Sequence, residues 1–135
     1  MTSIIREAGI AAPPKAAWAA LREFAALHEL ARGFVTGTEL EDERTRVVTF
    51  FNGATAREVL IGIDDTARRI AWTITDLTGA AHHSGSAQIL ADGEDPDRCR
   101  LLWITDVLPD NVADRLGTMM DAGLAAMKRT LESGD

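Results

Sequence analysis

The stretch that decides the fold is LPDNVADRLGTMMDAGLAAMKRTLE, residues 108–132, near the C-terminal end of the chain. Pro109 and Asp110 are typical of a helix start, and Gly134 beyond it is typical of a helix end. The pattern predicts a helix over residues 109–132, about 36 Å long at 1.5 Å per residue. Its apolar residues recur at steps of three and four and therefore share one helix face: Val112, Leu116, Met119, Met120, Gly123, Met127 and Leu131. So long an apolar face needs a large partner surface.

The preceding part of the chain supplies that surface as predicted strands. From residue 34 the apolar period changes to two, and turn-forming residues recur at short intervals. The predicted strands cover residues 3–10, 34–40, 46–51, 56–63, 69–75, 81–90 and 100–107. The joins between the last six are residues 41–44, Asn52-Gly53, Asp64-Asp65, Thr78-Gly79 and 92–97. Connections this short favour neighbouring antiparallel strands, because crossover helices need more residues.

Two short helices are predicted between the first strand and the rest. Pro13 and Pro14 open a helix over residues 15–24, and a second over residues 25–32 ends at Gly33. The order predicts a single α+β domain over residues 1–135, a curved seven-stranded antiparallel sheet wrapped around the long C-terminal helix. One helix cannot fill a strongly bent sheet, so we expect a ligand cavity, with a void above about 100 Å³.

Composition and charge exclude several classes of partner. The net charge of −7 is spread along the chain without a basic stripe, which argues against nucleic acid and anionic membrane surfaces. No apolar run approaches 18 residues, so no membrane insertion is expected. The single cysteine, Cys99, and the absence of a signal peptide favour the cytoplasm. No zinc, Walker or GxGxxG pattern occurs, so neither a metal nor another cofactor is predicted.

Three segments resemble a known protein family. They are PPKAAWAALREFAALHELA (residues 13–31), REVLIGIDDTARRIAWTI (residues 57–74), and HHSGSAQIL with CRLLWITDVLPD (residues 82–90 and 99–110). The chain resembles the SRPBCC superfamily, START/birch-pollen-allergen-like helix-grip proteins, in its polyketide cyclase/dehydrase and lipid-transport branch. That superfamily includes aromatase/cyclases, hormone receptors, lipid carriers, hydrolase-like enzymes and co-chaperone domains. The resemblance implies a helix-grip fold, a small hydrophobic or aromatic ligand, and a monomer or homodimer. It leaves enzyme, carrier or sensor, and protein-partner module open.

His83 is the first candidate for acid–base chemistry. Period-two alternation places Ala81, His83, Gly85, Ala87 and Ile89 on one strand face. That face is the more apolar one, so it should point inward, and the neighbouring histidine, residue 82, should face solvent. A histidine in the cavity could donate, accept or shuttle a proton near neutral pH. The alternative is a histidine bonded to a neighbouring strand or helix.

Carboxylates supply the other two catalytic candidates. The resemblance implies a carboxylate or hydroxyl that points into the pocket near residues 57–58, where local alternation does not choose between Arg57 and Glu58. The alternative for Glu58 is a solvated ion pair on the convex face. Asp106, on the same strand face as Leu102 and Ile104, could face the cavity mouth and bond His83, or cap the long helix. The predicted catalytic set is His83, Glu58 and Asp106.

The predicted ligand-binding set is larger. The resemblance implies a pocket entrance close to His28 and Arg32, and the set also contains Arg57, Trp72, Trp103, Met119, Met120, Gly123 and Met127. The methionines would form an adaptable lining, although an ordinary core face also contains them. The chain has no tyrosine, a common proton donor of pocket enzymes, which weakens assignment as a cyclase.

Overall fold

The computed structural model describes residues 1–75 and 79–134 of the chain. Its elements follow the predicted order of one strand, two short helices, six strands and one long helix. They are β1 (Thr2–Ile10), α1 (Pro14–Leu21), the 3-10 turn η1 (Phe24–Ala26), α2 (Leu27–Leu30), β2 (Val35–Asp42), β3 (Thr45–Phe50), β4 (Thr55–Asp64), β5 (Arg69–Thr75), β6 (His82–Asp92), β7 (Asp95–Leu108), the 3-10 turn η2 (Asp110–Val112) and α3 (Ala113–Ser133).

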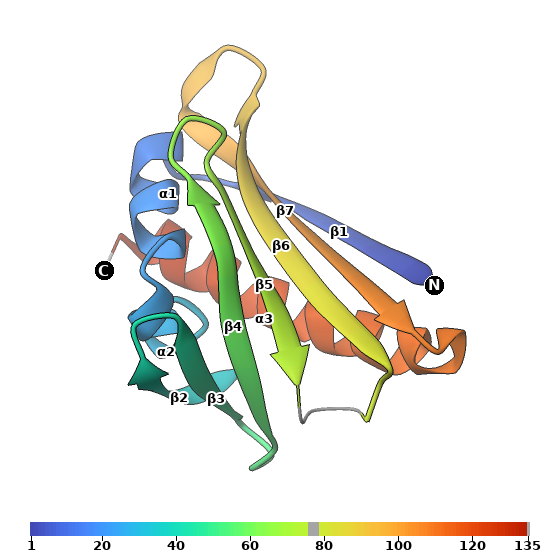
Figure 1. The fold of residues 1–135 in the computed structure, drawn as a ribbon. Helices are drawn as coiled ribbons and strands as arrows, with labels where there is room; N and C mark the ends of the chain where they lie inside the picture. Colours follow the sequence, from blue (N-terminus) through green and yellow to red (C-terminus); the bar gives the residue numbers. More distant parts are fainter. Residues whose placement is uncertain (76–78, 135) are drawn as a thin grey trace.

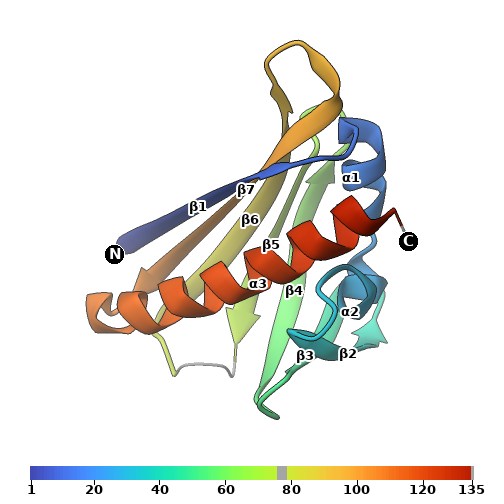
Figure 2. The same ribbon diagram turned by 180° about the vertical axis from the view of Figure 1, so that it is seen from behind.

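All seven strands form one antiparallel sheet in the order β1-β7-β6-β5-β4-β3-β2. The first and last strands pair, so that Ile4 lies opposite Thr105. Helix α3 crosses the same face of the sheet that α1 and α2 flank (Figures 1 and 2). This is the α+β helix-grip fold that the sequence predicts.

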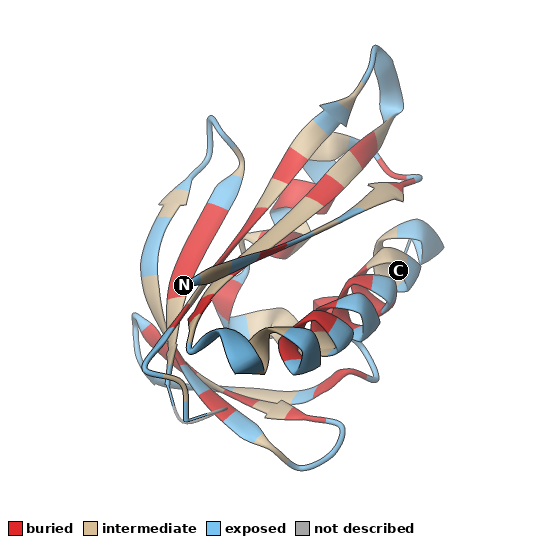
Figure 3. Ribbon diagram, turned by 90° about the vertical axis from the view of Figure 1, so that its right-hand side faces the viewer, coloured by how far each residue is buried: buried red, intermediate tan, exposed pale blue. Residues whose placement is uncertain are grey.

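The long helix lies in the concavity of the sheet. Figure 3 shows its buried side facing the strands and its exposed side facing away from them. Of the predicted stripe, Leu116, Met120, Gly123 and Met127 are buried, and Gly117, Leu124 and Ala126 are buried beside them. The α-helix begins at Ala113 instead of Pro109, because residues 110–112 form the tighter turn η2. It ends at Ser133, and the following residue, Gly134, adopts a positive φ of 76°, which is easy for glycine.

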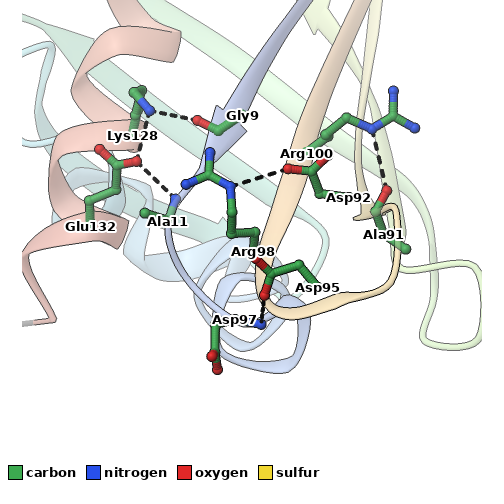
Figure 4. Close-up of polar contacts among 10 residues, drawn as sticks. All are labelled: Gly9, Ala11, Ala91, Asp92, Asp95, Asp97, Arg98, Arg100, Lys128 and Glu132. Carbon is green, nitrogen blue, oxygen red and sulfur yellow. Dashed lines mark hydrogen bonds and ion pairs between the residues drawn. The ribbon is translucent and has the colours of Figure 1, made fainter.

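Two side chains of α3 tie its C-terminal end to the last residues of β1 and to Ala11, which follows the strand (Figure 4). Lys128 Nζ donates to the carbonyl oxygen of Gly9 at 2.6 Å and to Glu132 at 2.7 Å. Glu132 Oε2 also accepts from the backbone N–H of Ala11 at 2.8 Å. The hydrogen bond from Lys128, and then that from Ala11, lower the pKa of Glu132. These bonds fix where the helix ends along β1.

Local departures from the sequence prediction have identifiable causes. Helices α1 and α2 are shorter than predicted, because η1 interrupts the chain between them. Strand β7 begins at Asp95, well before the predicted residue 100, since Gly93 adopts a positive φ of 61° in a tight turn. The predicted turn Thr78-Gly79 lies partly outside the described residues.

Strand β4 contains a break in its alternation. The pairing with β5 shifts between Leu60 and Gly62, which is a bulge. Ile61 is consequently 56% exposed, while Ile63 packs against the core on the same side as Leu60. The simple alternation predicted for residues 57–63 therefore holds only up to Leu60.

Candidate ligand-binding site

A cavity of about 80 Å³ lies between α3 and the concave face of the sheet. This is smaller than the void of about 100 Å³ expected from the sequence, and below the roughly 300–1,000 Å³ of common ligand pockets. The large side chains of Phe34, Trp72 and Trp103 fill much of the concavity. The full lining is Leu21, Leu27, Ala31, Phe34, Val35, Arg46, Phe50, Glu58, Ile70, Trp72, Ile74, His83, Ala87, Trp103, Thr105, Leu116, Met119, Met120 and Met127.

Two glycines make room for the aromatic walls of the cavity. A Cβ at Gly85 would lie 2.9 Å from Cε2 and 3.1 Å from Nε1 of Trp72, so this indole lies directly over Gly85. A Cβ at Gly123 would lie 2.9 Å from Phe34 and 3.0 Å from Trp103. Gly123, predicted to bind ligand, is thus placed behind the aromatic lining instead of in it.

A buried ion pair forms one end of the cavity wall. Arg46 on β3 lies opposite Glu58 on β4, and both side chains face inward. Arg46 Nε and Nη2 approach Glu58 Oε1 at 2.8 and 2.7 Å. Arg46 Nη1 donates to the carbonyl oxygen of Phe24 at 2.9 Å, and the guanidinium lies 4.2 Å from the centre of the Phe24 ring. Among the described residues nothing bonds Glu58 Oε2, which leaves one carboxylate oxygen free on the wall.

His83 is the second titratable group of the wall. Its side chain is buried and lines the cavity, while His82 is exposed and bonds Ser84, as the alternation predicts. Burial, and to a lesser extent the nearby charge of His82, lower the pKa of His83 from 6.5 to about 4. Within residues 1–75 and 79–134 the imidazole has no hydrogen-bond partner. At neutral pH it is therefore uncharged, with one nitrogen that donates and one that accepts.

Strand register brings Glu58 and His83 into one row. Glu58 pairs with Ile74 on β5. Thr73 on β5 pairs with Ser84 on β6, so the next residues of these two antiparallel strands, Ile74 and His83, lie side by side. The two residues are thus two strands apart, or about 10 Å between backbones at the usual strand spacing. Since both side chains line the same cavity, a small molecule between them could contact both.

Two polar residues of the wall were not predicted. Thr105 on β7 lies opposite Gly85, is 3% exposed and lines the cavity. Arg46 on β3 is the second polar wall residue that the sequence did not predict. Alternation could have identified each, because Arg46 shares a strand face with Val48 and Phe50, and Thr105 alternates with Trp103 and Val107.

The structure places two predicted residues on the other face of the sheet. Asp106 lies there, where its carboxylate accepts a hydrogen bond from the Ser3 hydroxyl. It therefore neither faces the cavity nor bonds His83, and among residues 1–75 and 79–134 no side chain caps α3 or η2. The predicted inward face of this strand was wrong, because Trp103, Thr105 and Val107 are the residues that point inward. Arg57 is also exposed and pairs with Glu41 at 2.6 Å.

The two residues predicted at the pocket entrance, His28 and Arg32, also lie outside the cavity lining. Arg32 is exposed, donates to the carbonyl oxygen of Glu29 at 3.1 Å, and borders a separate surface groove between α1, α2 and the end of α3. His28 is partly buried, and its Nδ1 has no partner among the described residues. The remaining predicted residues, Trp72, Trp103, Met119, Met120 and Met127, do line the cavity.

Metal-ligating clusters and membrane-spanning helices are both absent from residues 1–75 and 79–134. No group of three or more His, Cys, Asp or Glu side chains in these ranges is placed to hold a metal ion. No helix in the same ranges has the length and apolar character needed to cross a membrane.

Comparisons with known proteins agree with this architecture. Similar solved structures include XoxI from Bacillus cereus (TM-score 0.86, 17% identity, covering 97% of this chain and 96% of that one). A START superfamily protein from Mycobacterium smegmatis has a TM-score of 0.79 at 13% identity, covering 98% and 99%. Norcoclaurine synthase from Thalictrum flavum, in complex with dopamine and hydroxybenzaldehyde, has a TM-score of 0.74 at 19% identity, covering 98% and 84%. At these identities the likeness concerns the fold alone.

Sequence comparison gives a more specific assignment. No curated protein sequence matches the chain. Residues 1–132, however, match the family described as polyketide cyclase / dehydrase and lipid transport. Because this match covers nearly the whole chain, the protein belongs to the polyketide cyclase/dehydrase and lipid-transport family.

Proposed function

We propose that this protein binds a small, largely apolar molecule between α3 and the sheet and moves a proton on it with Glu58 and His83. One observation carries the proposal. An otherwise apolar cavity presents a carboxylate oxygen and an imidazole, both without partners among the described residues, from one row of the sheet. An apolar cavity with a few polar groups on its wall is the usual form of a ligand site, which favours a ligand that bonds these two groups.

The chemistry that suits the pair is proton transfer next to a carbonyl group. Glu58 Oε2 accepts a proton from the carbon beside the carbonyl, and the N–H of His83 donates a hydrogen bond to the carbonyl oxygen as negative charge develops there. A carboxylate base with an uncharged imidazole is an established combination for forming an enolate. Cyclisation, dehydration and isomerisation of carbonyl compounds can each begin with this step.

The surroundings support these roles. The Arg46 guanidinium offsets the cost of burying the Glu58 charge and holds Oε1, so that Oε2 remains available. Burial keeps His83 uncharged, because its pKa is about 4. Norcoclaurine synthase, which shares the fold, is described in complex with dopamine and hydroxybenzaldehyde, so a protein of this fold can hold a small aromatic carbonyl compound.

The test uses acetophenone, a small aromatic ketone whose methyl protons exchange with solvent through an enolate. Incubation in D2O with the protein should accelerate loss of the methyl signal in proton NMR. Glu58→Gln and His83→Ala should each reduce the exchange rate at least about 100-fold, the low end of acid–base contributions. The matched control is Asp106→Asn, which changes a carboxylate on the outer face and should leave the rate unchanged. Equal exchange with and without protein would remove the catalytic proposal.

A carrier or sensor is the second candidate function. Most of the lining is apolar, from Leu21 to Met127, and a carrier needs the same lining. It predicts that ligand binding survives while protein-catalysed exchange is absent, so the same experiment separates the two. The protein-partner alternative has less support. The exposed large apolar residues are Met1, Ile5, Leu40, Phe51 and Ile61, and of these Ile5 on β1 and Leu40 on β2 lie at opposite edges of the sheet.

A further inference from the structure

Two buried indole N–H groups in the cavity wall have no hydrogen-bond acceptor. Trp18 Nε1 donates to Asp65 at 2.9 Å, as a buried tryptophan ordinarily does. Nε1 of Trp72 and of Trp103, in contrast, are buried without a partner among residues 1–75 and 79–134. Trp72 is 7% exposed, and both residues line the cavity. A buried donor without an acceptor is costly, so these two groups need an explanation.

The two indoles come from β5 and β7, the strands on either side of β6. The Nε1 edge of the Trp72 indole lies over Gly85, because a Cβ there would be 3.1 Å from this nitrogen. Thr105 lies directly across from Gly85 on β7 and also lines the cavity. Trp103 is two residues before Thr105 on the same strand face, and His83 is two residues before Gly85 on its own. Both unpartnered indole nitrogens thus belong to residues of the cavity wall, and an acceptor oxygen of a ligand in the cavity would supply the partner that they lack.

The cavity offers no unpaired charge to a ligand. Arg46 and Glu58 are the two charged residues among its described lining, and they pair with each other at 2.7 Å. The imidazole of His83 is uncharged at neutral pH. An anion would enter without a free cation to bind it, and a cation would face a carboxylate already paired with Arg46. Burying an ion without a partner is strongly unfavourable.

We propose that the ligand is an uncharged molecule with an acceptor oxygen, such as a ketone, and that Trp72 and Trp103 donate their indole N–H groups to this end. The proposal rests on the cavity binding a ligand, as proposed above, and adds its chemical class. It excludes free fatty-acid carboxylates and amines as the preferred ligands. Glycine is then required at position 85, because only a residue without a Cβ lets the Trp72 indole lie against the sheet with its nitrogen toward β6.

The experiment compares three probes of similar size: acetophenone, ethylbenzene and benzoate. Acetophenone should bind about tenfold more tightly than ethylbenzene, the effect of one to two net hydrogen bonds, although ethylbenzene is more apolar. Benzoate should bind more weakly than acetophenone. In a ¹H–¹⁵N spectrum the Nε1–H signals of Trp72 and Trp103 should move downfield with acetophenone, while that of Trp18 should stay in place.

Matched variants assign the effect to the nitrogen atoms. Trp72→Phe and Trp103→Phe should each reduce acetophenone affinity several-fold and change ethylbenzene affinity much less. Trp18→Phe is the control, because this indole lies outside the cavity lining, and should change neither affinity. Equal affinity for acetophenone and ethylbenzene, or preference for benzoate, would overturn the inference. If no probe binds, the cavity-binding function fails together with it. Selective acetophenone binding without proton exchange would uphold this inference and remove only the catalytic step.

Discussion

The guanidinium of Arg46 and the carboxylate of Glu58 pair at 2.7 Å across neighbouring strands, with both side chains almost fully buried. The pair answers a question that sequence leaves open, namely whether residue 57 or residue 58 faces inward. It also connects the sheet to the helical segment, because Arg46 donates to the carbonyl oxygen of Phe24. One arginine therefore orients the proposed base and holds η1 against the cavity.

Removal of one partner of this pair should be strongly destabilising. Arg46→Met leaves the Glu58 charge buried without a partner, and we expect a loss of about 3–5 kcal/mol in the free energy of unfolding. Urea unfolding measures it. The double variant Arg46→Met/Glu58→Met should recover much of that loss, because it leaves no unpaired charge. A single variant as stable as the original protein would contradict the buried pair.

His83 should make stability depend on pH between about 6.5 and 4. Its pKa is lowered on folding, so the unfolded chain takes up a proton at higher pH than the folded protein does. The stabilisation is thus complete above pH 6.5 and is lost as pH falls toward 4. His83→Gln should show a shallower decrease of unfolding free energy over this window. Carboxylates contribute equally to both proteins, so identical pH profiles would show that His83 is not buried as a neutral group.

Gly85→Ala should disturb the cavity wall. The added Cβ would lie 2.9 Å from the rigid indole of Trp72, which must move, and we expect a cost of about 1–3 kcal/mol. The Trp72 Nε1–H signal should shift, and acetophenone affinity should fall. Gly62→Ala is the matched strand control, since a Cβ there has nothing within 4 Å. Equal effects of the two substitutions on stability and on acetophenone affinity would contradict the close packing of Trp72 against Gly85.

The end of α3 should loosen when its anchor is removed. Lys128→Met eliminates the hydrogen bonds to Gly9 and Glu132 and should cost about 1 kcal/mol. The Ala11 amide, which donates to Glu132, should then exchange faster with deuterium. Arg129→Met, at an exposed neighbouring position, serves as the control. Unchanged Ala11 exchange in the Lys128 variant would show that the anchor is not needed at this end.

Periodicity predicts the architecture because each element repeats its signal many times. The stripe from Leu116 to Met127 and the alternation around His83 both identify the buried face correctly. Asp106 shows the limit of the method. Its strand is apolar on both faces, so the alternation does not indicate which face points inward. Leu102 and Ile104 lie on one face, and Leu101 and Trp103 lie on the other.

The polar part of the site depends on pairing between distant strands. Arg46 and Glu58 are twelve residues apart, and only the β3–β4 register places them face to face. The bulge after Leu60 further alters the alternation in a way that no local pattern indicates. The cavity volume was overestimated for a related reason, because the sequence does not show how far Trp72 and Phe34 lean into the concavity.

The central claim is that the cavity lined by Glu58 and His83 holds a small uncharged molecule. Native mass spectrometry of the protein purified from its own host tests this most directly, followed by identification of any co-purified compound. The variant Ala87→Leu, which fills the cavity from the floor, provides the comparison. We predict one bound molecule with an apolar skeleton and an acceptor oxygen, lost in Ala87→Leu. A protein that carries no ligand, or a ligand retained equally by the filled variant, would contradict the account.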